Sequence, residues 1–487
     1  MPPRTTRRPV SPGWTLVAAS LGFVLVVLDV TVVNVAMERI KLSLGTSVTG
    51  LQWVLNAYTL VFASLLLTAG ALGDRLGAKR VFVAGFMLFT AASLACGLSG
   101  SIAVLIGARA VQGIGAALCV PASLALLNAA YPEPASRARA ISIWAGVGGL
   151  AVAAGPVVGG VMVYRLGWPS IFFVNVPLGL VGIGLTLAHA PSGPQAPGRG
   201  LDLPGQLLAV LALAGITIAC VESGALGWTH PLVLAGFGAC AVAGGLFLIV
   251  QARSAEPMLP LSLFRSPVVS VACWTGLTVN FAFYGLMFVF SLFFQTVKGY
   301  SPLMTGLAFL PMTALVTVAN LVAGRLSSRF GPRLPMMVGQ AIAASGYFAL
   351  LSIRPATPYG LIVAPLLAAG VGAALTVPAM TAAVLENAPR QQAGIAAGAL
   401  NAARQTGGVI GVGVFGSLLA ARAGQPLGSM HLALLIAGLA LGVGCIACWR
   451  WGGATLANHE CRAARGAARS MARASNNAAT PRTNNKR

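Results

Sequence analysis

Two sequence patterns occur twice in this chain, once in each half. The charged string at residues 73–80 (GDRLGAKR) lies between two apolar stretches, and a changed copy lies at residues 324–333 (GRLSSRFGPR). A second pair is closer, because residues 113–122 (GIGAALCVPA) and 370–379 (GVGAALTVPA) differ at two positions. Both pairs occur in the same order and at nearly the same spacing, which is typical of a duplicated membrane fold. We therefore expect two structurally related halves.

The composition indicates that lipid surrounds most of the chain. Apolar residues make up 57% of 487 residues and charged residues only 8%, whereas a soluble domain carries roughly a quarter charged residues. Apolar runs of about 18 residues or more are long enough to cross a bilayer, and the chain contains fourteen such runs. The sequence predicts an all-α membrane protein.

The positions of the basic residues predict the topology. A net charge of +22 would suit a nucleic-acid-binding protein, but these residues concentrate in alternate loops rather than in one patch. Lys and Arg accumulate in cytoplasmic loops of membrane proteins. We therefore expect a multi-pass protein of the inner (cytoplasmic) membrane, with both termini cytoplasmic and no nucleic-acid partner.

The duplicated patterns also predict the organisation along the chain. We expect a cytoplasmic N-terminus, a first six-helix bundle, a linker, an inserted helix pair, a second linker, a second six-helix bundle and a basic, disordered cytoplasmic tail. These segments span residues 1–13, 14–190, 191–203, 204–251, 252–267, 268–449 and 450–487, respectively.

Four motifs resemble those of the major facilitator superfamily and, within it, the fourteen-span drug:proton antiporters. They are residues 28–36 (LDVTVVNVA), 73–80, 109–115 (RAVQGIG) and 155–160 (GPVVGG). The chain departs from the extended fifth-span pattern, which expects glycines where it has Ser142 and Ala151. The resemblance implies a major facilitator fold of two six-helix bundles plus two inserted helices.

Two charged residues inside predicted spans are candidates for proton coupling. Asp29 lies within the first span, where an ionised carboxylate costs about 2.5 to 3.5 kcal/mol, so it needs a functional or structural reason to be there. Arg109 lies in the fourth span and stays protonated. The resemblance assigns its position to proton transfer, whereas the chemistry of Arg favours a role in tuning a neighbouring acid. A purely structural ion pair is the alternative.

Polar and aromatic residues within the spans are candidates for a substrate cavity. They are Asn34, Trp53, Tyr58, Gln112, Glu222, Asn280 and Tyr284. Aromatic faces attract cations, but aromatic residues are also common at membrane interfaces. Glu222 is equally consistent with an acid at the membrane surface.

The resemblance implies two further groups of functional residues. The first is a cytoplasmic gate that clasps the two halves, comprising Gly73, Asp74, Arg75, Gly77, Lys79, Arg80, Arg329, Gly331 and Arg333. A merely basic topogenic loop is the alternative for this group. The second is the antiporter helix motif, comprising Gly155, Pro156, Gly159 and Gly160.

The sequence favours secondary transport over catalysis. It contains no nucleotide-binding loop, nucleophile constellation or metal-ligand spacing, so we expect no cofactor and no metal. We predict an antiporter, functional as a monomer, that exports hydrophobic or cationic small molecules in exchange for protons. An uptake symporter of the same fold and a membrane-embedded transferase are the alternatives.

Overall fold

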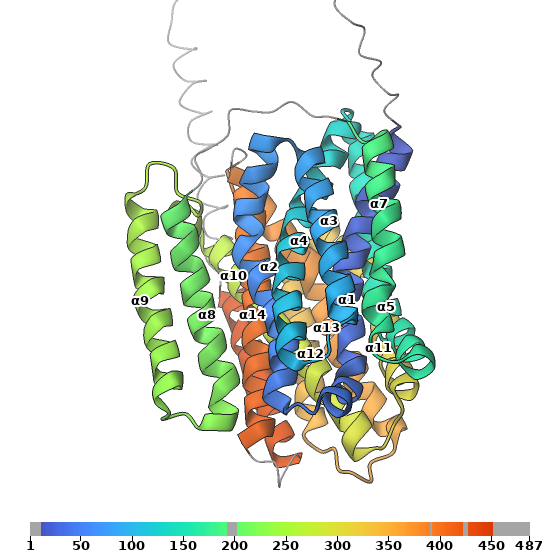
Figure 1. Ribbon diagram of the computed structural model, residues 1–487. Helices are drawn as coiled ribbons and strands as arrows, with labels where there is room; N and C mark the ends of the chain where they lie inside the picture. Colours follow the sequence, from blue (N-terminus) through green and yellow to red (C-terminus); the bar gives the residue numbers. More distant parts are fainter. Residues whose placement is uncertain (1–10, 192–201, 390–391, 422–426, 451–487) are drawn as a thin grey trace, which may run out of the picture.

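The computed structural model describes residues 11–191, 202–389, 392–421 and 427–450, and these residues form a bundle of long helices without strands (Figure 1). The first half contains α1 (Pro12–Leu44), α2 (Val48–Leu76), α3 (Ala78–Gly97), α4 (Ile102–Ala130), α5 (Pro134–Leu166), α6 (Ser170–Phe173) and α7 (Asn175–His189). The predicted N-terminal segment, first linker and basic tail lie largely outside the described residues.

The remaining helices complete the bundle. The inserted pair is α8 (Leu203–Leu226) and α9 (Pro231–Arg253), followed by the short η1 (Leu261–Arg265). The second half contains α10 (Pro267–Leu292), a π-helical turn η2 (Phe293–Val297), α11 (Pro302–Phe330), α12 (Arg333–Leu350), α13 (Tyr359–Asn387), α14 (Ala393–Ala421) and a last helix at Leu427–Arg450.

The helices account for the fourteen predicted spans. Twelve segments of the described chain are long and apolar enough to cross a membrane. The helices α12 and α14 supply the other two predicted spans and pack inside the same bundle, against α13 and α10 respectively. The sixth predicted span is interrupted at Val174, between α6 and α7.

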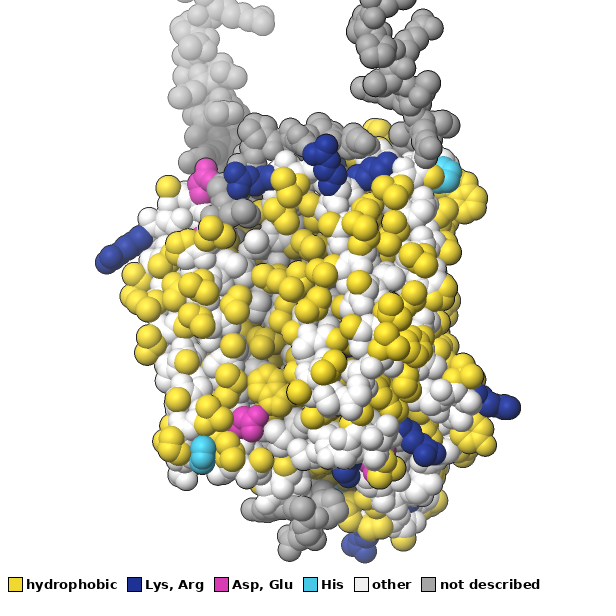
Figure 2. Space-filling view, viewed as in Figure 1, with side chains coloured by type: hydrophobic (Ala, Val, Ile, Leu, Met, Phe, Trp, Pro, Cys, Tyr) yellow, Lys and Arg dark blue, Asp and Glu magenta, His cyan; other side chains and the backbone are white. Residues whose placement is uncertain are grey.

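The surface of the bundle suits a membrane. In Figure 2 apolar side chains cover the middle of the visible face, and the Lys and Arg side chains lie toward its two ends. Together with the apolar helices, this surface describes a multi-pass membrane protein.

The repeated loop motifs have equivalent structures. Gly77 follows α2 with φ 91°, and Gly331 follows α11 with φ 76°. L-residues with a side chain rarely adopt such positive φ values, so glycine is needed at both turns. The pairing of neighbouring helices is also repeated, since α3 packs on α4 as α12 packs on α13, and α1 packs on α5 as α10 packs on α14.

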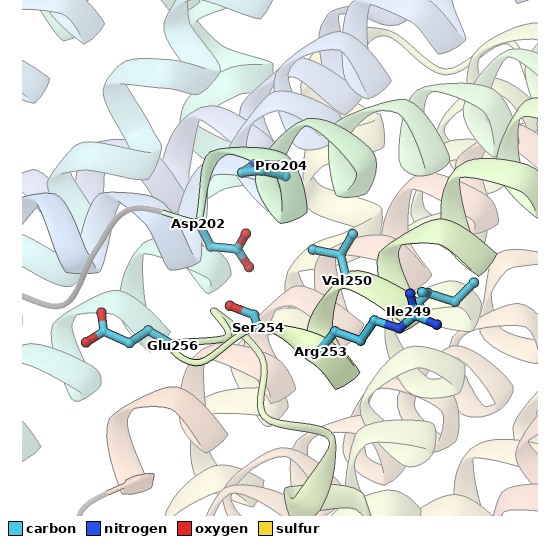
Figure 3. Close-up of a pocket in the computed structure, with 7 residues that line it drawn as sticks. All are labelled: Asp202, Pro204, Ile249, Val250, Arg253, Ser254 and Glu256. Carbon is cyan, nitrogen blue, oxygen red and sulfur yellow. The ribbon is translucent and has the colours of Figure 1, made fainter.

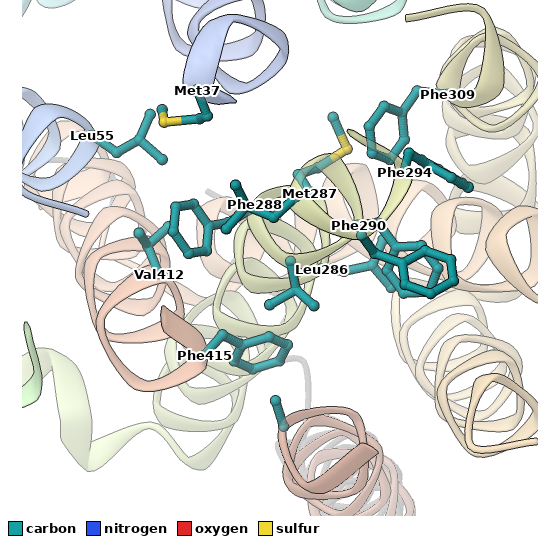
Figure 4. Close-up of a cluster of buried hydrophobic side chains, with 14 of the residues drawn as sticks. Met37, Leu55, Leu286, Met287, Phe288, Phe290, Phe294, Phe309, Val412 and Phe415 are labelled. Carbon is teal, nitrogen blue, oxygen red and sulfur yellow. The ribbon is translucent and has the colours of Figure 1, made fainter. Parts of the chain in front are cut away.

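The two halves share one apolar core at only one end of the bundle. We call the end where α1 begins the N-terminal end and the end where α1 finishes the far end. At the far end a single cluster joins the halves, with Met37 and Leu55 of the first half close to Phe288 and Val412 of the second (Figure 4). Toward the N-terminal end each half has its own cluster instead.

The inserted pair lies beside the seam between the halves. The helix α8 packs against both α2 and α14, and α9 lies on the outside against α8 (Figure 1). Polar contacts tie α8 to α2 at both ends. At one end Gln206 donates to the Ser64 carbonyl oxygen at 2.8 Å and accepts from the Thr68 hydroxyl. At the other end the Trp53 indole N–H donates to the Glu222 carboxylate.

Candidate functional site

A completely buried ion pair joins α1 to α4 inside the first half. Asp29 is 1% exposed and Arg109 is 0% exposed. The Arg109 Nη1 donates to Asp29 Oδ2, and to Gln112 Oε1 at 2.7 Å. The structure thus brings together the two residues that the sequence singles out for proton coupling.

Three uncharged side chains complete the hydrogen bonding around this pair. The Gln112 Nε2 donates to Asp29 Oδ1 at 2.9 Å and to Ser93 Oγ at 2.8 Å. The Asn175 Nδ2 reaches the same two oxygens, each at 3.3 Å. Sequence reasoning did not find Ser93 and Asn175; the only signal was that each is a polar residue within an apolar segment.

Aromatic side chains and a main-chain carbonyl enclose the guanidinium of Arg109. Its Cζ lies 4.3 Å from the centre of the Tyr58 ring and 5.8 Å from that of Phe172. Its Nε donates to the Val54 carbonyl oxygen at 3.0 Å, whereas its Nη2 has no hydrogen-bond partner. The enclosure limits water access, and in a low dielectric both the attraction within the pair and the cost of breaking it are large.

The structure separates the predicted cavity residues into different environments. Gln112 and Tyr58 belong to the surroundings of the ion pair described above. Trp53 donates through its indole nitrogen to Glu222 Oε1 at 2.7 Å, which joins α2 to α8. The side chain of Glu222 is therefore held at the seam between the inserted pair and the first half.

The remaining predicted cavity residues lie on the helices that border the centre of the bundle. Asn34 is buried on α1, where its Nδ2 donates to the Val30 carbonyl oxygen at 2.9 Å and its Oδ1 has no partner. Asn280 and Tyr284 lie one turn apart on α10. Residues four apart lie on the same face of a helix, so these two side chains share one face of α10.

The duplicated loop motifs hold two basic residues in matching roles. The Lys79 Nζ donates to the carbonyl oxygens of Leu187 and Ala190, at 3.0 and 2.9 Å, where α7 ends. In the second half Arg333 donates to the carbonyl oxygens of Cys448 and Trp449, at 3.2 and 2.5 Å, at the end of the last helix. Cations suit the free carbonyl groups at a helix C-terminus.

The other predicted gate residues do not clasp the two halves in this structure. Asp74, Arg75, Arg80 and Arg329 are exposed, and Arg329 lies 5.3 Å from the ring of its neighbour Phe330. Within the described chain, the side chain of Asp74 forms no hydrogen bond or ion pair.

The predicted antiporter motif lies where α5 meets two other helices. A Cβ atom on Gly155 would lie 1.9 Å from Thr31 Oγ1, and one on Gly159 would lie 2.9 Å from Val32 Cγ1, so both glycines allow α1 to approach. Gly160 and Pro156 face α11 of the other half. A Cβ atom on Gly160 would lie 2.8 Å from the Pro302 carbonyl oxygen.

Uncharged hydrogen bonds connect the halves at and near the far end, and sequence reasoning missed them. Gln52 of α2 donates to the Val412 and Gly413 carbonyl oxygens of α14, at 3.1 and 2.8 Å. Ser291 donates to the Asn34 carbonyl oxygen at 2.5 Å, and Gln295 to that of Val35 at 3.3 Å. We call Gln52, Ser291 and Gln295 the far-end latch. Its donors are ordinary span residues that use main-chain acceptors, so no charge pattern marks them.

A surface groove of about 540 Å³ lies at the N-terminal end of the inserted pair (Figure 3). Asp202 caps α8 by accepting from the Gly205 N–H at 2.9 Å and also accepts from Gln251 and the Met258 N–H, at 2.5 and 3.3 Å. The guanidinium of Arg253 points away from this carboxylate (Figure 3). The groove lies outside both six-helix halves, so it does not belong to the ion-pair site.

These features define a class of protein: a multi-pass helical membrane transporter built from two related halves, with a buried ion pair in one of them. Comparison with known proteins supports the class. Residues 19–412 match the model of the Major Facilitator Superfamily, and the chain belongs to this superfamily. Its members move small molecules across membranes, so the chain is a transporter rather than an enzyme.

Similar proteins carry names that refer to resistance and export. The chain is 38% identical to the methylenomycin A resistance protein of Streptomyces coelicolor, over 92% of this chain and 94% of that protein. It is 38% identical to the multidrug resistance protein Stp of Mycobacterium tuberculosis, over 84% and 76%. It is 35% identical to the tetracenomycin C resistance and export protein of Streptomyces glaucescens, also over 84% and 76%.

The fold is also found in a solved structure. A bacterial homologue of the human lysosomal transporter Spinster, crystallised in an inward-facing and unoccupied conformation, superimposes with a TM-score of 0.66 at 17% identity. The match covers 90% of this chain and 96% of that one. The predicted family and fold class are confirmed.

Proposed function

We propose that this protein is an antiporter that exports hydrophobic small molecules, including drugs or antibiotics, in exchange for protons. It lies in the cytoplasmic membrane with both termini in the cytoplasm. The names of the similar proteins support the export of antibiotics. The buried Asp29–Arg109 pair is the single observation that supports proton coupling, because a carboxylate enclosed in a bilayer-spanning helix is costly without a function.

The ion pair supports a simple coupling step. When Asp29 is ionised, it holds Arg109 together with Gln112 and Asn175. Protonation removes the negative charge and leaves the guanidinium buried without a counter-ion, a costly arrangement. The helices α1 and α4 then favour another packing. A proton gradient thereby biases the two conformations of the transporter.

The rest of the bundle supports alternating access. If the termini are cytoplasmic, the far end faces outward, and the shared apolar core and the far-end latch close the outer side. The unpaired state of Asp74 agrees with a cytoplasmic gate that is released in this conformation. Rocking of one half against the other then exposes the centre to each side in turn.

Purified protein in sealed liposomes tests the exchange directly. We expect an imposed pH difference to drive a lipophilic dye in the direction opposite to the protons, at a rate at least ten times that measured with the pH difference collapsed. Equal rates under the two conditions would overturn the proton-coupled mechanism. The alternative, an uptake symporter, predicts that dye and protons move in the same direction.

A further inference from the structure

Arg404 is a second charged residue in the middle of a span, and unlike Arg109 it has no acidic partner. It lies near the centre of α14 and is partly exposed. Its Nη1 donates to Asn401 Oδ1 at 3.4 Å, and its Nε is enclosed without a partner. No Asp or Glu of the described chain forms an ion pair with it. Its charge is therefore uncompensated within the described bundle.

The helices α10 and α14 hold this guanidinium near the Tyr284 side chain, and Asn280 lies one turn from Tyr284 on α10. A Cβ atom on Gly276 of α10 would lie 3.0 Å from Arg404 Cγ, so the stem of Arg404 rests on that glycine. One turn further along α14, a Cβ atom on Gly408 would lie 2.9 Å from the Tyr284 ring, and Tyr284 is close enough to Arg404 to interact electrostatically. Asn280 lies between Gly276 and Tyr284, one turn from each. We call Asn280, Tyr284 and Arg404 the central polar group.

Three residues of α10 between its start and Tyr284 are less buried than most of the helix. Trp274 is 46% exposed, and Leu277 and Tyr284 on the same face are partly exposed, whereas most of α10 is buried. The hydrogen bonds that connect α10 and η2 to α1 lie at the far end, at Ser291 and Gln295. Within the central polar group, Tyr284 and Arg404 are partly exposed, and both lie on the N-terminal side of these hydrogen bonds.

The charges in the middle of the bundle determine which molecules suit the central polar group. The carboxylate of Asp29 is already bound by Arg109, Gln112 and Asn175, and that of Glu222 by Trp53. A cation at the centre would find no free carboxylate and would be repelled by Arg404. A carboxylate would find a guanidinium with a free edge, and the Tyr284 hydroxyl, which has no hydrogen-bond partner in the described chain, as a second donor.

We propose that the central polar group binds the carboxylate of a lipophilic acid, with Arg404 as the residue that selects for negative charge. This inference rests on the export function proposed above. The sequence predicts hydrophobic or cationic substrates, and this inference keeps the hydrophobic part of that prediction but replaces the positive charge with a negative one. The apolar walls of the bundle accommodate the rest of the molecule.

Three related fluorescent probes test the charge preference: dansylglycine, which carries a carboxylate, its neutral methyl ester, and the cationic dansylcadaverine. Their transport is measured in proteoliposomes with an imposed pH difference. We expect the unaltered protein to move dansylglycine faster than dansylcadaverine. Arg404→Gln should slow dansylglycine at least tenfold and the ester less than twofold, whereas Arg404→Lys should retain an intermediate rate.

A control variant and a stability measurement guard against misfolding. Arg253→Gln removes an equal charge from an exposed position at the end of α9 and should leave all three rates unchanged. The thermal unfolding temperature of each purified variant shows whether it is folded. As a second measurement, dansylglycine should raise the unfolding temperature of the unaltered protein but not that of Arg404→Gln.

The outcomes separate this inference from the proposed exchange mechanism. The inference fails if the unaltered protein transports only dansylcadaverine, if it transports none of the three probes, or if Arg404→Gln transports dansylglycine at the original rate. Proton-driven movement of dansylcadaverine alone would keep the antiporter and overturn the carboxylate site. Movement of dansylglycine without any effect of the pH difference would keep the carboxylate site and overturn the proton-coupled antiport.

Discussion

At the scale of single residues, the Asp29–Arg109 pair has two contributions that substitutions can separate, one to stability and one to coupling. Removing one partner of a buried ion pair leaves the other charge uncompensated and costs about 3–5 kcal/mol. We expect Asp29→Asn to insert into the membrane but to lose proton-driven efflux, with rates reduced at least tenfold. Efflux is measured in cells that lack other pumps, and insertion by immunoblotting of membranes.

The double substitution Asp29→Asn with Arg109→Gln distinguishes the two contributions. Since it removes both charges, we expect its thermal unfolding temperature to lie above that of Asp29→Asn alone, while proton-driven efflux stays absent. If efflux in Asp29→Asn equals that of the unaltered protein, Asp29 has no part in coupling.

The ion pair could be predicted from the sequence because charged residues are rare inside apolar spans. Asp29 and Arg109 therefore stand out, and opposite charges in lipid favour each other. Ser93 and Asn175 could not be predicted, because small polar residues in spans often bond to their own helix, as Ser93 also does through the Phe89 carbonyl oxygen. The binding of Gln112 to Asp29, rather than to a cavity, depends on a helix-to-helix distance that the sequence does not contain.

At the scale of helices, glycines decide how closely α5 approaches its neighbours. We expect Gly160→Leu to reduce transport at least tenfold, because any side chain at this position meets the main chain of α11 at Pro302 and Leu303. Gly146→Leu is a matched control, since Gly146 lies on the same helix in open space. Transport assays with both variants, at equal amounts of protein in the membrane, test this expectation. Loss of activity in both would show that α5 tolerates no leucine rather than that the contact with α11 matters.

The repeated basic residues of the loop motif should stabilise the ends of helices. Hydrogen bonds from charged groups contribute about 1.5–3 kcal/mol, which solvent reduces at these partly exposed sites. We expect Lys79→Ala and Arg333→Ala each to lower the thermal unfolding temperature by a few degrees. The exposed Arg80 provides the control, because Arg80→Ala should change the temperature by less than one degree. If the thermal unfolding temperature of Lys79→Ala equals that of the unaltered protein, Lys79 does not stabilise the end of α7.

The helices themselves were largely predictable, and their ends less so. Length and apolarity identify spans because every backbone group in lipid must be bonded within the helix. The helix α1 extends to Leu44, beyond the first apolar run, because its last turns carry Glu38 and Lys41, which form an ion pair at 3.7 Å. The sequence does not predict the π-helical turn η2, in which Gln295 donates to the carbonyl oxygens of Val35 on α1 and Ser291.

At the scale of the whole molecule, the far-end latch sets the balance between the two conformations. Gln52 is completely buried and donates to two carbonyl oxygens of the other half. Gln52→Leu removes both bonds, but it also removes the buried Oε1, which has no partner, so the net loss is about that of one hydrogen bond, roughly 0.5–1.5 kcal/mol. A loss of this size shifts a two-state equilibrium roughly two- to tenfold. We expect Gln52→Leu to increase the population open at the far end by this factor.

Chemical labelling of a single cysteine measures that population. Ala36→Cys, in a variant that lacks the eight native cysteines, places a thiol in the apolar cluster that joins the halves, where Ala36 is completely buried. A membrane-impermeant maleimide added from outside reacts only when the far end opens, and Gln52→Leu should raise the reaction rate two- to tenfold. Gln340→Leu in the same background is the control, because Gln340 is equally buried but its remaining bond lies within the second half, to the Met336 carbonyl oxygen. If both substitutions raised the rate equally, the effect would come from general loosening of the bundle, and the latch would have no specific role.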